Sequence, residues 1–316
     1  MMKEFPRKEI YVHTTPSKID SMSVKAVWDR EIRVPNYLKG YSQARWDVEN
    51  KGWTSSRLPS AVDVESVEGM LEIHCGINEY KNLIGGVKLG YHLKRSDVAV
   101  LHGLSTEIMP LTSDGVFPLE RRSATEHGNG FYDIPTSGQH AQMWLNKLEE
   151  AGYPDLAASM LDMTGFPKGN LLRTLGIKPT NNPIIYTGFS RGFEVSLDTQ
   201  FNGFTRTSIE CEELRDLSEK NKGLFYYKFE DLLKVLDSVG KNEGVFEDVY
   251  GNKPQANKQT GAFALVDDCL GTLLSNTYHL LGNGNGAYAE GVDVLRRRGY
   301  TVNEVPKGLI HLSSLQ

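Results

Sequence analysis

The sequence predicts an α/β protein in which strands and helices alternate along most of the chain. Residues 68–76 alternate apolar and polar side chains with the period of a half-buried strand. From about residue 98, two apolar runs flank an Asp-Gly turn at 112–115, the pattern typical of a β-hairpin. Residues 142–151 and 265–282 place apolar side chains at helical spacing. Both kinds of element are therefore expected within one chain.

The N-terminal part, residues 1–95, is expected to form an α+β extension or subdomain. A short helix bounded by Gly40 and Gly52 precedes the strand at 68–76. After the hairpin, a strand ends at Arg121 and Arg122 and a turn-rich segment covers 128–140. The remaining expected elements are helices near 141–152, 155–165 and 169–177, strands at 182–189 and 191–197, a helix after residue 210, a strand and helix within 225–239, and a helix at 265–282 that stops at the glycine-rich run 282–286. Thr207 and Glu210 have the spacing of a capping box before the fourth of these helices.

Composition limits the classes of function. The chain has 316 residues with a formal net charge of −5, and 39% of its residues are hydrophobic. These values are ordinary for a globular protein and do not support a strongly basic groove for duplex nucleic acid. A local basic patch that binds a small phosphorylated ligand remains compatible with them.

Cysteine usage and the absence of apolar segments predict a cytoplasmic protein. Cys75, Cys211 and Cys269 are far apart and lack the spacing of a zinc motif, which favours a reducing compartment. We find neither a signal peptide nor an apolar run long enough to span a membrane, so no membrane association is expected. A homo-oligomer is compatible with the sequence, which does not specify one.

Three segments between residues 98 and 240 resemble the Nudix hydrolase superfamily. They are PLERRS (118–123), FYDIPTSGQH (131–140) and NLLRTLGI (170–177). In that family a strand ending in basic residues leads to a G-x-W-x-x-P-x-G-G-H turn and then to the box G-x5-E-x7-R-E-U-x-E-E-x-G-U, where U is aliphatic. The resemblance implies an α/β/α sandwich with a mixed sheet over residues 96–316, carrying a helical insert at 141–168. It also implies pyrophosphate hydrolysis of a nucleoside diphosphate-linked small molecule, with Mg²⁺ or Mn²⁺ as cofactor.

The box itself departs from the family pattern in both of its alignments. Aligned on Gly176 and Ile177, it places Asn170, Arg173 and Thr174 where the family has metal-binding glutamates. An alternative register uses Glu149 and Glu150 but shortens the distance from Gly138. We favour the first register, because an apolar strand follows residue 177 whereas another helix follows residue 153. An inactive module that binds a nucleotide or nucleotide sugar, or a regulatory subunit, is therefore the alternative to a divergent hydrolase.

The predicted site residues fall into two groups. Arg121, Arg122, Arg173, Gly138 and Gln139 are expected to bind the phosphorylated ligand, because a guanidinium matches phosphate oxygens. His140, Glu149 and Glu150 are the candidate catalytic residues, with His140 as general acid or base. We expect no metal in the free protein, and Glu149 and Glu150 as the ligands if one binds. The structural alternatives are a solvated strand end for the arginines, a backbone hydrogen bond for His140 and a solvated helix face for the glutamates.

Overall fold

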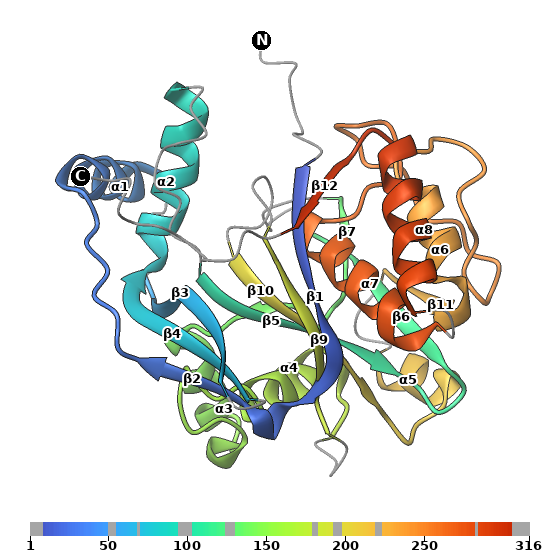
Figure 1. Cartoon of the computed structure of the whole chain (residues 1–316), viewed down its shortest axis with the longest axis horizontal. Helices are drawn as coiled ribbons and strands as arrows, with labels where there is room; N and C mark the ends of the chain where they lie inside the picture. Colours follow the sequence, from blue (N-terminus) through green and yellow to red (C-terminus); the bar gives the residue numbers. More distant parts are fainter. Residues whose placement is uncertain are drawn as a thin grey trace.

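The computed structural model describes residues 9–49, 55–67, 70–93, 103–123, 130–178, 183–191, 198–218, 223–281 and 284–304 (Figure 1). These residues form a mixed α/β fold built around one large sheet. Its strands, in order across the sheet, are β12 (Thr301–Glu304), β1 (Glu9–Asp20), β9 (Ile185–Arg191), β10 (Asp198–Arg206), β5 (Gly103–Leu111), β3 (Arg57–Val67), β4 (Met70–Glu79) and β2 (Val24–Trp28), with β8 (Gly138–Gln139) paired to β5.

The large sheet mixes parallel and antiparallel pairs. Strands β1 and β12, β5 and β10, and β2 and β4 run parallel, whereas the remaining neighbours are antiparallel. The predicted strand at 68–76 is confirmed as β4, and the N-terminal strands β1 to β4 belong to the same sheet as β5, β9 and β10. The predicted boundary between residues 95 and 96 lies outside the described residues.

A smaller sheet contains β11 (Leu224–Lys228), β6 (Val116–Arg121) and β7 (Tyr132–Asp133) in that order. The Asp-Gly turn connects β5 to β6, and Gly115 in this turn has the positive φ of 78° that glycine tolerates. The predicted hairpin is nevertheless wrong. Strand β6 pairs with β11 and β7, whereas β5 pairs with β10, β3 and β8, so the turn carries the chain from one sheet to the other.

Helices cover both faces of the large sheet. They are α1 (Asn36–Glu49), α2 (Tyr80–Leu93), α3 (Gln142–Glu150), α4 (Gly165–Leu175), α5 (Cys211–Leu217), α6 (Leu232–Ser238), α7 (Asp267–Leu280) and α8 (Gly284–Arg297), with short 3-10 turns at Ser21–Ser23, Pro154–Leu156 and Phe229–Asp231. Helix α7 packs on β1, β9 and β10, and α8 and α6 lie beyond it (Figure 1). On the opposite face, Leu171 and Leu175 of α4 share a core with Phe189 and Phe201 of the sheet.

Two local predictions for the helices are corrected by the structure. The predicted helix at 155–165 does not form. Residues 155–164 make a 3-10 turn and an irregular segment before α4 begins at Gly165, because Asp162 accepts hydrogen bonds from the backbone of Ala158, Thr164 and Gly165. The capping box before α5 does not form either. Glu210 makes no side-chain cap, and the backbone N–H of Cys211 donates instead to Asp114 in the Asp-Gly turn, 3.1 Å away.

All three cysteines of the chain are free thiols. Cys75, Cys211 and Cys269 are buried, and none of them forms a disulfide. Within the described ranges, no helix combines the length and the apolar character that crossing a bilayer requires.

The backbone of β9 lies very close to that of β1 at Gly188, which allows a test of the pairing between these strands. A Cβ at this position would lie 2.1 Å from the carbonyl oxygen of His13 on β1, and a backbone atom in a paired strand cannot easily move away. We expect Gly188→Ala to lower the free energy of unfolding by about 2–3 kcal/mol, which denaturant titration would measure. Gly40→Ala is the matched control, because a Cβ at Gly40 in helix α1 meets no atom within 4 Å. That change should stabilise the protein by about 0.5–1 kcal/mol, and equal destabilisation by both changes would contradict the described register.

Candidate functional site

A positively charged cavity opens beside the small sheet. It has a volume of about 520 Å³, within the range of small-molecule sites. Its lining contains three cationic side chains, those of Arg121, Arg122 and Lys258, and no carboxylate among the described residues. The remaining lining residues are Ser123, Gly130, Tyr132, Gly223, Phe225, Gln255 and Gln259. This composition favours an anionic ligand.

Arg121 is held in the cavity wall by a neutral partner. Its Nη1 donates to Oε1 of Gln255 over 2.7 Å, and its buried Nε has no hydrogen-bond partner among the described residues. Gln255 is itself fixed by Tyr132, whose hydroxyl oxygen accepts from the Gln255 backbone N–H at 2.8 Å. Because no described carboxylate pairs with Arg121, its charge remains available to an anion.

Arg122, by contrast, forms a buried ion pair. Its Nε donates to Oδ2 of Asp133 over 2.9 Å, and its Nη2 donates to the same oxygen. The Asp133 side chain is 5% exposed and that of Arg122 is 23% exposed. Asp133 therefore neutralises Arg122 and fixes its guanidinium at the inner wall of the cavity.

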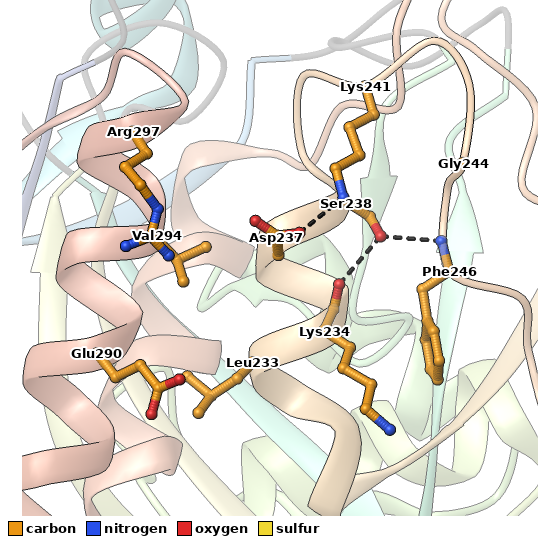
Figure 2. Close-up of a pocket in the computed structure, with 10 residues that line it drawn as sticks. All are labelled: Leu233, Lys234, Asp237, Ser238, Lys241, Gly244, Phe246, Glu290, Val294 and Arg297. Carbon is orange, nitrogen blue, oxygen red and sulfur yellow. Dashed lines mark hydrogen bonds and ion pairs between the residues drawn. The ribbon is translucent and has the colours of Figure 1, made fainter.

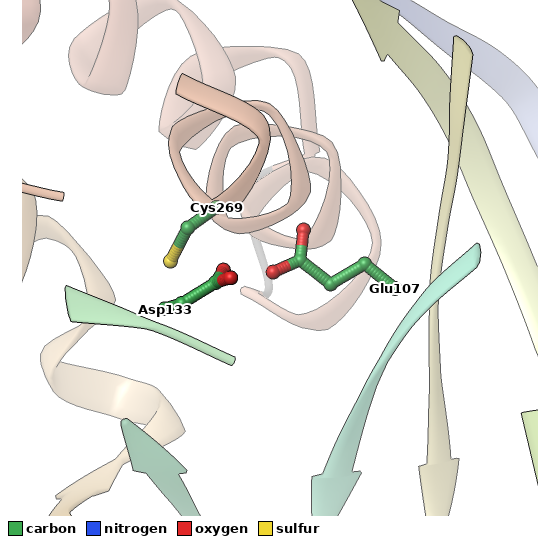
Figure 3. Close-up of side chains that lie close together, drawn as sticks. All are labelled: Glu107, Asp133 and Cys269. Carbon is green, nitrogen blue, oxygen red and sulfur yellow. The ribbon is translucent and has the colours of Figure 1, made fainter. Parts of the chain in front are cut away.

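Behind Arg122 lies a buried cluster of Glu107, Asp133 and Cys269, which we call the acidic cluster (Figure 3). One ligand atom from each residue lies within 4.8 Å of the others, so these residues could hold a metal ion. Burial, together with the nearby Asp133 carboxylate, raises the pKa of Glu107 well above its usual range. Burial and the charges of Glu107 and Asp133 likewise raise the pKa of the Cys269 thiol. The cluster joins β5, β7 and α7.

A second hollow, of about 440 Å³, lies between α6 and α8 (Figure 2). Acidic side chains in its wall neutralise most of its positive charge. Nζ of Lys241 lies 2.6 Å from Asp237, and Glu290 also lines the wall. Asp237 also pairs with Arg298 at 2.9 Å. The balance of charge makes this hollow a weaker candidate for an anion than the cavity at Arg121.

His140 lies outside the cavity, in a fully buried position. Its Nδ1 lies 2.9 Å from the carbonyl oxygen of Met160, so Nδ1 carries the proton and donates. Its Nε2 then accepts from the hydroxyl of Thr106, 3.2 Å away. The ring also stacks on Phe166, with centroids 4.1 Å apart. Burial lowers the pKa of His140 to about 4, so the ring is neutral near pH 7.

The structure places Gly138, Gln139 and Arg173 away from the arginine cavity. Gly138 and Gln139 form β8 on the edge of β5, and a Cβ on Gly138 would lie 2.7 Å from Nδ2 of Asn170 on α4. The guanidinium of Arg173 stacks on Trp144, 4.0 Å from its ring centroid. The segment 131–140 and helix α4 thus pack against each other at Gly138 and Asn170.

Glu149 and Glu150 are exposed at the end of α3. No cluster of metal-binding side chains among the described residues includes either of them. The structure therefore brings Arg121 and Arg122 together in one cavity and leaves the other predicted residues outside it.

Sequence reasoning missed the acidic cluster. The available signal was a single acid, Glu107, in the otherwise uncharged strand 103–111, since an ionisable side chain inside a buried strand requires a partner. The partners Asp133 and Cys269 are distant in sequence and could not be assigned without the fold.

Comparison with known proteins gives no family assignment. No protein-family model matches the sequence, and no curated protein matches it.

The buried neutral His140 predicts a specific loss of stability in acid. Its pKa is about 4 in the folded state and near 6.5 when unfolded, so the unfolded state binds more protons as the pH falls between these values. The free energy of unfolding then falls by about 2 kcal/mol as the pH is lowered from 7 to 5. We expect His140→Asn to be less stable at pH 7 but to lack this slope in denaturant titrations. Parallel pH profiles for the two proteins would contradict the assignment.

Proposed function

We propose that the chain binds a small phosphorylated ligand, such as a nucleotide, in the cavity lined by Arg121, Arg122 and Lys258. The observation that carries this proposal is the excess positive charge of the cavity. Three cationic side chains line it. Among the described residues, the carboxylate that pairs with one of them is Asp133, and its partner is Arg122. Arginine forks and lysine both bind phosphate oxygens through charge-assisted hydrogen bonds.

The rest of the lining suits an organic group attached to the phosphate. Phe225 is half-buried on β11, and its ring meets Tyr132 edge to face, with centroids 5.4 Å apart. An aromatic face beside a cationic pocket can stack a nucleobase. Gln255 and Gln259 add amide groups that can hydrogen-bond to a base or sugar.

The order of elements supports a divergent Nudix-like architecture for this module. Strands β5 and β6 are followed by β7, β8, helix α3 in the expected insert, helix α4 and strand β9, an order compatible with the resemblance apart from the missing β5–β6 hairpin. Helices lie on both faces of the mixed sheet.

We propose that the chain binds this ligand without hydrolysing it. The box-like helix α4 carries Asn170, Arg173 and Thr174 where the family has glutamates, and Mg²⁺ requires oxygen ligands, usually with at least one carboxylate. Glu149 and Glu150 are exposed on another helix. Among the described residues, neither helix α4 nor the lining of the cavity supplies the carboxylates that the resemblance requires.

Ligand titration tests the proposal. Pyrophosphate and nucleoside mono- and diphosphates should stabilise the protein in thermal-shift assays and bind in calorimetry. We expect Arg121→Ala to weaken this binding by roughly 10- to 100-fold, equivalent to about 1.5–3 kcal/mol for a charge-assisted contact. Lys258→Ala should act in the same direction.

The control variants must separate binding from folding. Lys228→Ala removes the same charge from the far end of strand β11, where Lys228 pairs with Val116, and should leave affinity unchanged. Arg122→Ala is unsuitable, because it would leave Asp133 buried without its partner, at a cost of about 3–5 kcal/mol in stability. Unchanged affinity in both Arg121→Ala and Lys258→Ala would contradict the proposed site. Turnover of the same compounds with Mg²⁺ or Mn²⁺ would instead support the hydrolase.

A further inference from the structure

We infer that Glu107, Asp133 and Cys269 form a binding site for a thiophilic divalent cation, with Zn²⁺ as the best match. The site is distinct from the metal position that the Nudix resemblance implies, because none of its residues lies on α4 or α3. It is also independent of the anion cavity, since it needs no phosphorylated ligand.

Three rigid elements bring the ligand atoms together. Glu107 projects from β5, Asp133 from β7 and Cys269 from the first turn of α7 (Figure 3). Their ligand atoms lie within 4.8 Å of one another, and all three side chains are buried. A separation of this size requires only a small inward shift for a common ion.

An unpartnered oxygen points to a missing group. Glu107 is 0% exposed, yet its Oε1 has no hydrogen-bond partner among the described residues. When both acids are ionised, the nearby Asp133 carboxylate can only accept and cannot satisfy this oxygen. A buried acceptor without a donor is costly, so a proton or a cation must lie between the two groups.

The charges balance for a divalent ion. With both carboxylates and the thiol ionised, the cluster carries three negative charges, of which Arg122 compensates one through Asp133. A divalent cation neutralises the other two.

The donor set selects zinc over magnesium. One thiolate and two carboxylates match the sulfur and oxygen ligands of Zn²⁺, which is borderline soft and usually four-coordinate. Mg²⁺ instead prefers six oxygen ligands in octahedral geometry.

Neighbouring groups fix the ligand carboxylates. The hydroxyl of Thr272 donates to Oε2 of Glu107 at 2.6 Å, which leaves Oε1 for the ion. The backbone N–H of Ile134 donates to Oδ1 of Asp133 at 2.9 Å, while Arg122 holds Oδ2. Hydrogen bonds of this kind orient metal ligands and are part of a built site.

Titration of the full chain with Zn²⁺ alone, after treatment with a chelator, tests the inference. We expect one equivalent to bind, and Co²⁺ in its place to give the near-ultraviolet charge-transfer band of a cobalt–thiolate bond. Glu107→Gln should lower zinc affinity at least 100-fold while remaining folded, because its amide can donate to Asp133 as a protonated glutamate would. Cys269→Ser should abolish the cobalt band.

Two matched variants control for charge and for cysteine loss elsewhere. Glu149→Gln removes an exposed carboxylate on α3, and Cys211→Ser removes a buried cysteine outside the cluster. Both should bind zinc like the wild type. Absence of stoichiometric zinc binding by the wild type would overturn the inference and favour a proton shared by the two carboxyl groups. Equal zinc affinity in Glu107→Gln would also overturn it, because the ion would then bind without Glu107. A cobalt band that persists in Cys269→Ser and disappears in Cys211→Ser would also overturn it.

Discussion

The buried carboxyl groups of Glu107 and Asp133 constrain the centre of this fold, because they lie where the large sheet, the small sheet and helix α7 meet. Two acids cannot share a dry position as anions, so each requires compensation. Asp133 obtains it from Arg122, and Glu107 from the hydroxyl of Thr272 together with a proton or a cation. The chain passes from the large sheet to the small sheet at the Asp-Gly turn between β5 and β6. Glu107 lies on β5 in the large sheet, and Asp133 lies on β7, which pairs with β6 in the small sheet.

The ion pair between Arg122 and Asp133 also determines the charge of the cavity. Asp133 neutralises Arg122 on the buried side of the cavity wall, so the excess positive charge that faces solvent comes from Arg121 and Lys258. A guanidinium held by a neutral amide loses little conformational entropy when it binds an anion. Under the proposed function, the guanidinium of Arg121 is therefore oriented before a phosphorylated ligand binds, and the aromatic and amide side chains around it would select the organic group of that ligand.

Local patterns predicted elements better than they predicted pairing. The alternation at 68–76 was sufficient for β4, and the helical spacing at 265–282 was sufficient for α7, which is buried all round over residues 267–277. The Asp-Gly signal located a turn but not the partners of its strands, which come from β10 and β11 far along the chain. Arg121 and Arg122 could be chosen because a strand end exposes side chains, whereas Glu107 and Cys269 meet only through tertiary packing.

The central claim is that Arg121 and Lys258 form the contact surface for a phosphorylated ligand. A crystal structure of the protein with bound pyrophosphate or a nucleoside diphosphate tests it most directly. We expect phosphate density within hydrogen-bond distance of the Arg121 guanidinium and the Lys258 ammonium group, with the ion pair between Arg122 and Asp133 intact. Phosphate density in the hollow between α6 and α8, or beside Arg173 and Trp144, with the arginine cavity free of ligand, would contradict it.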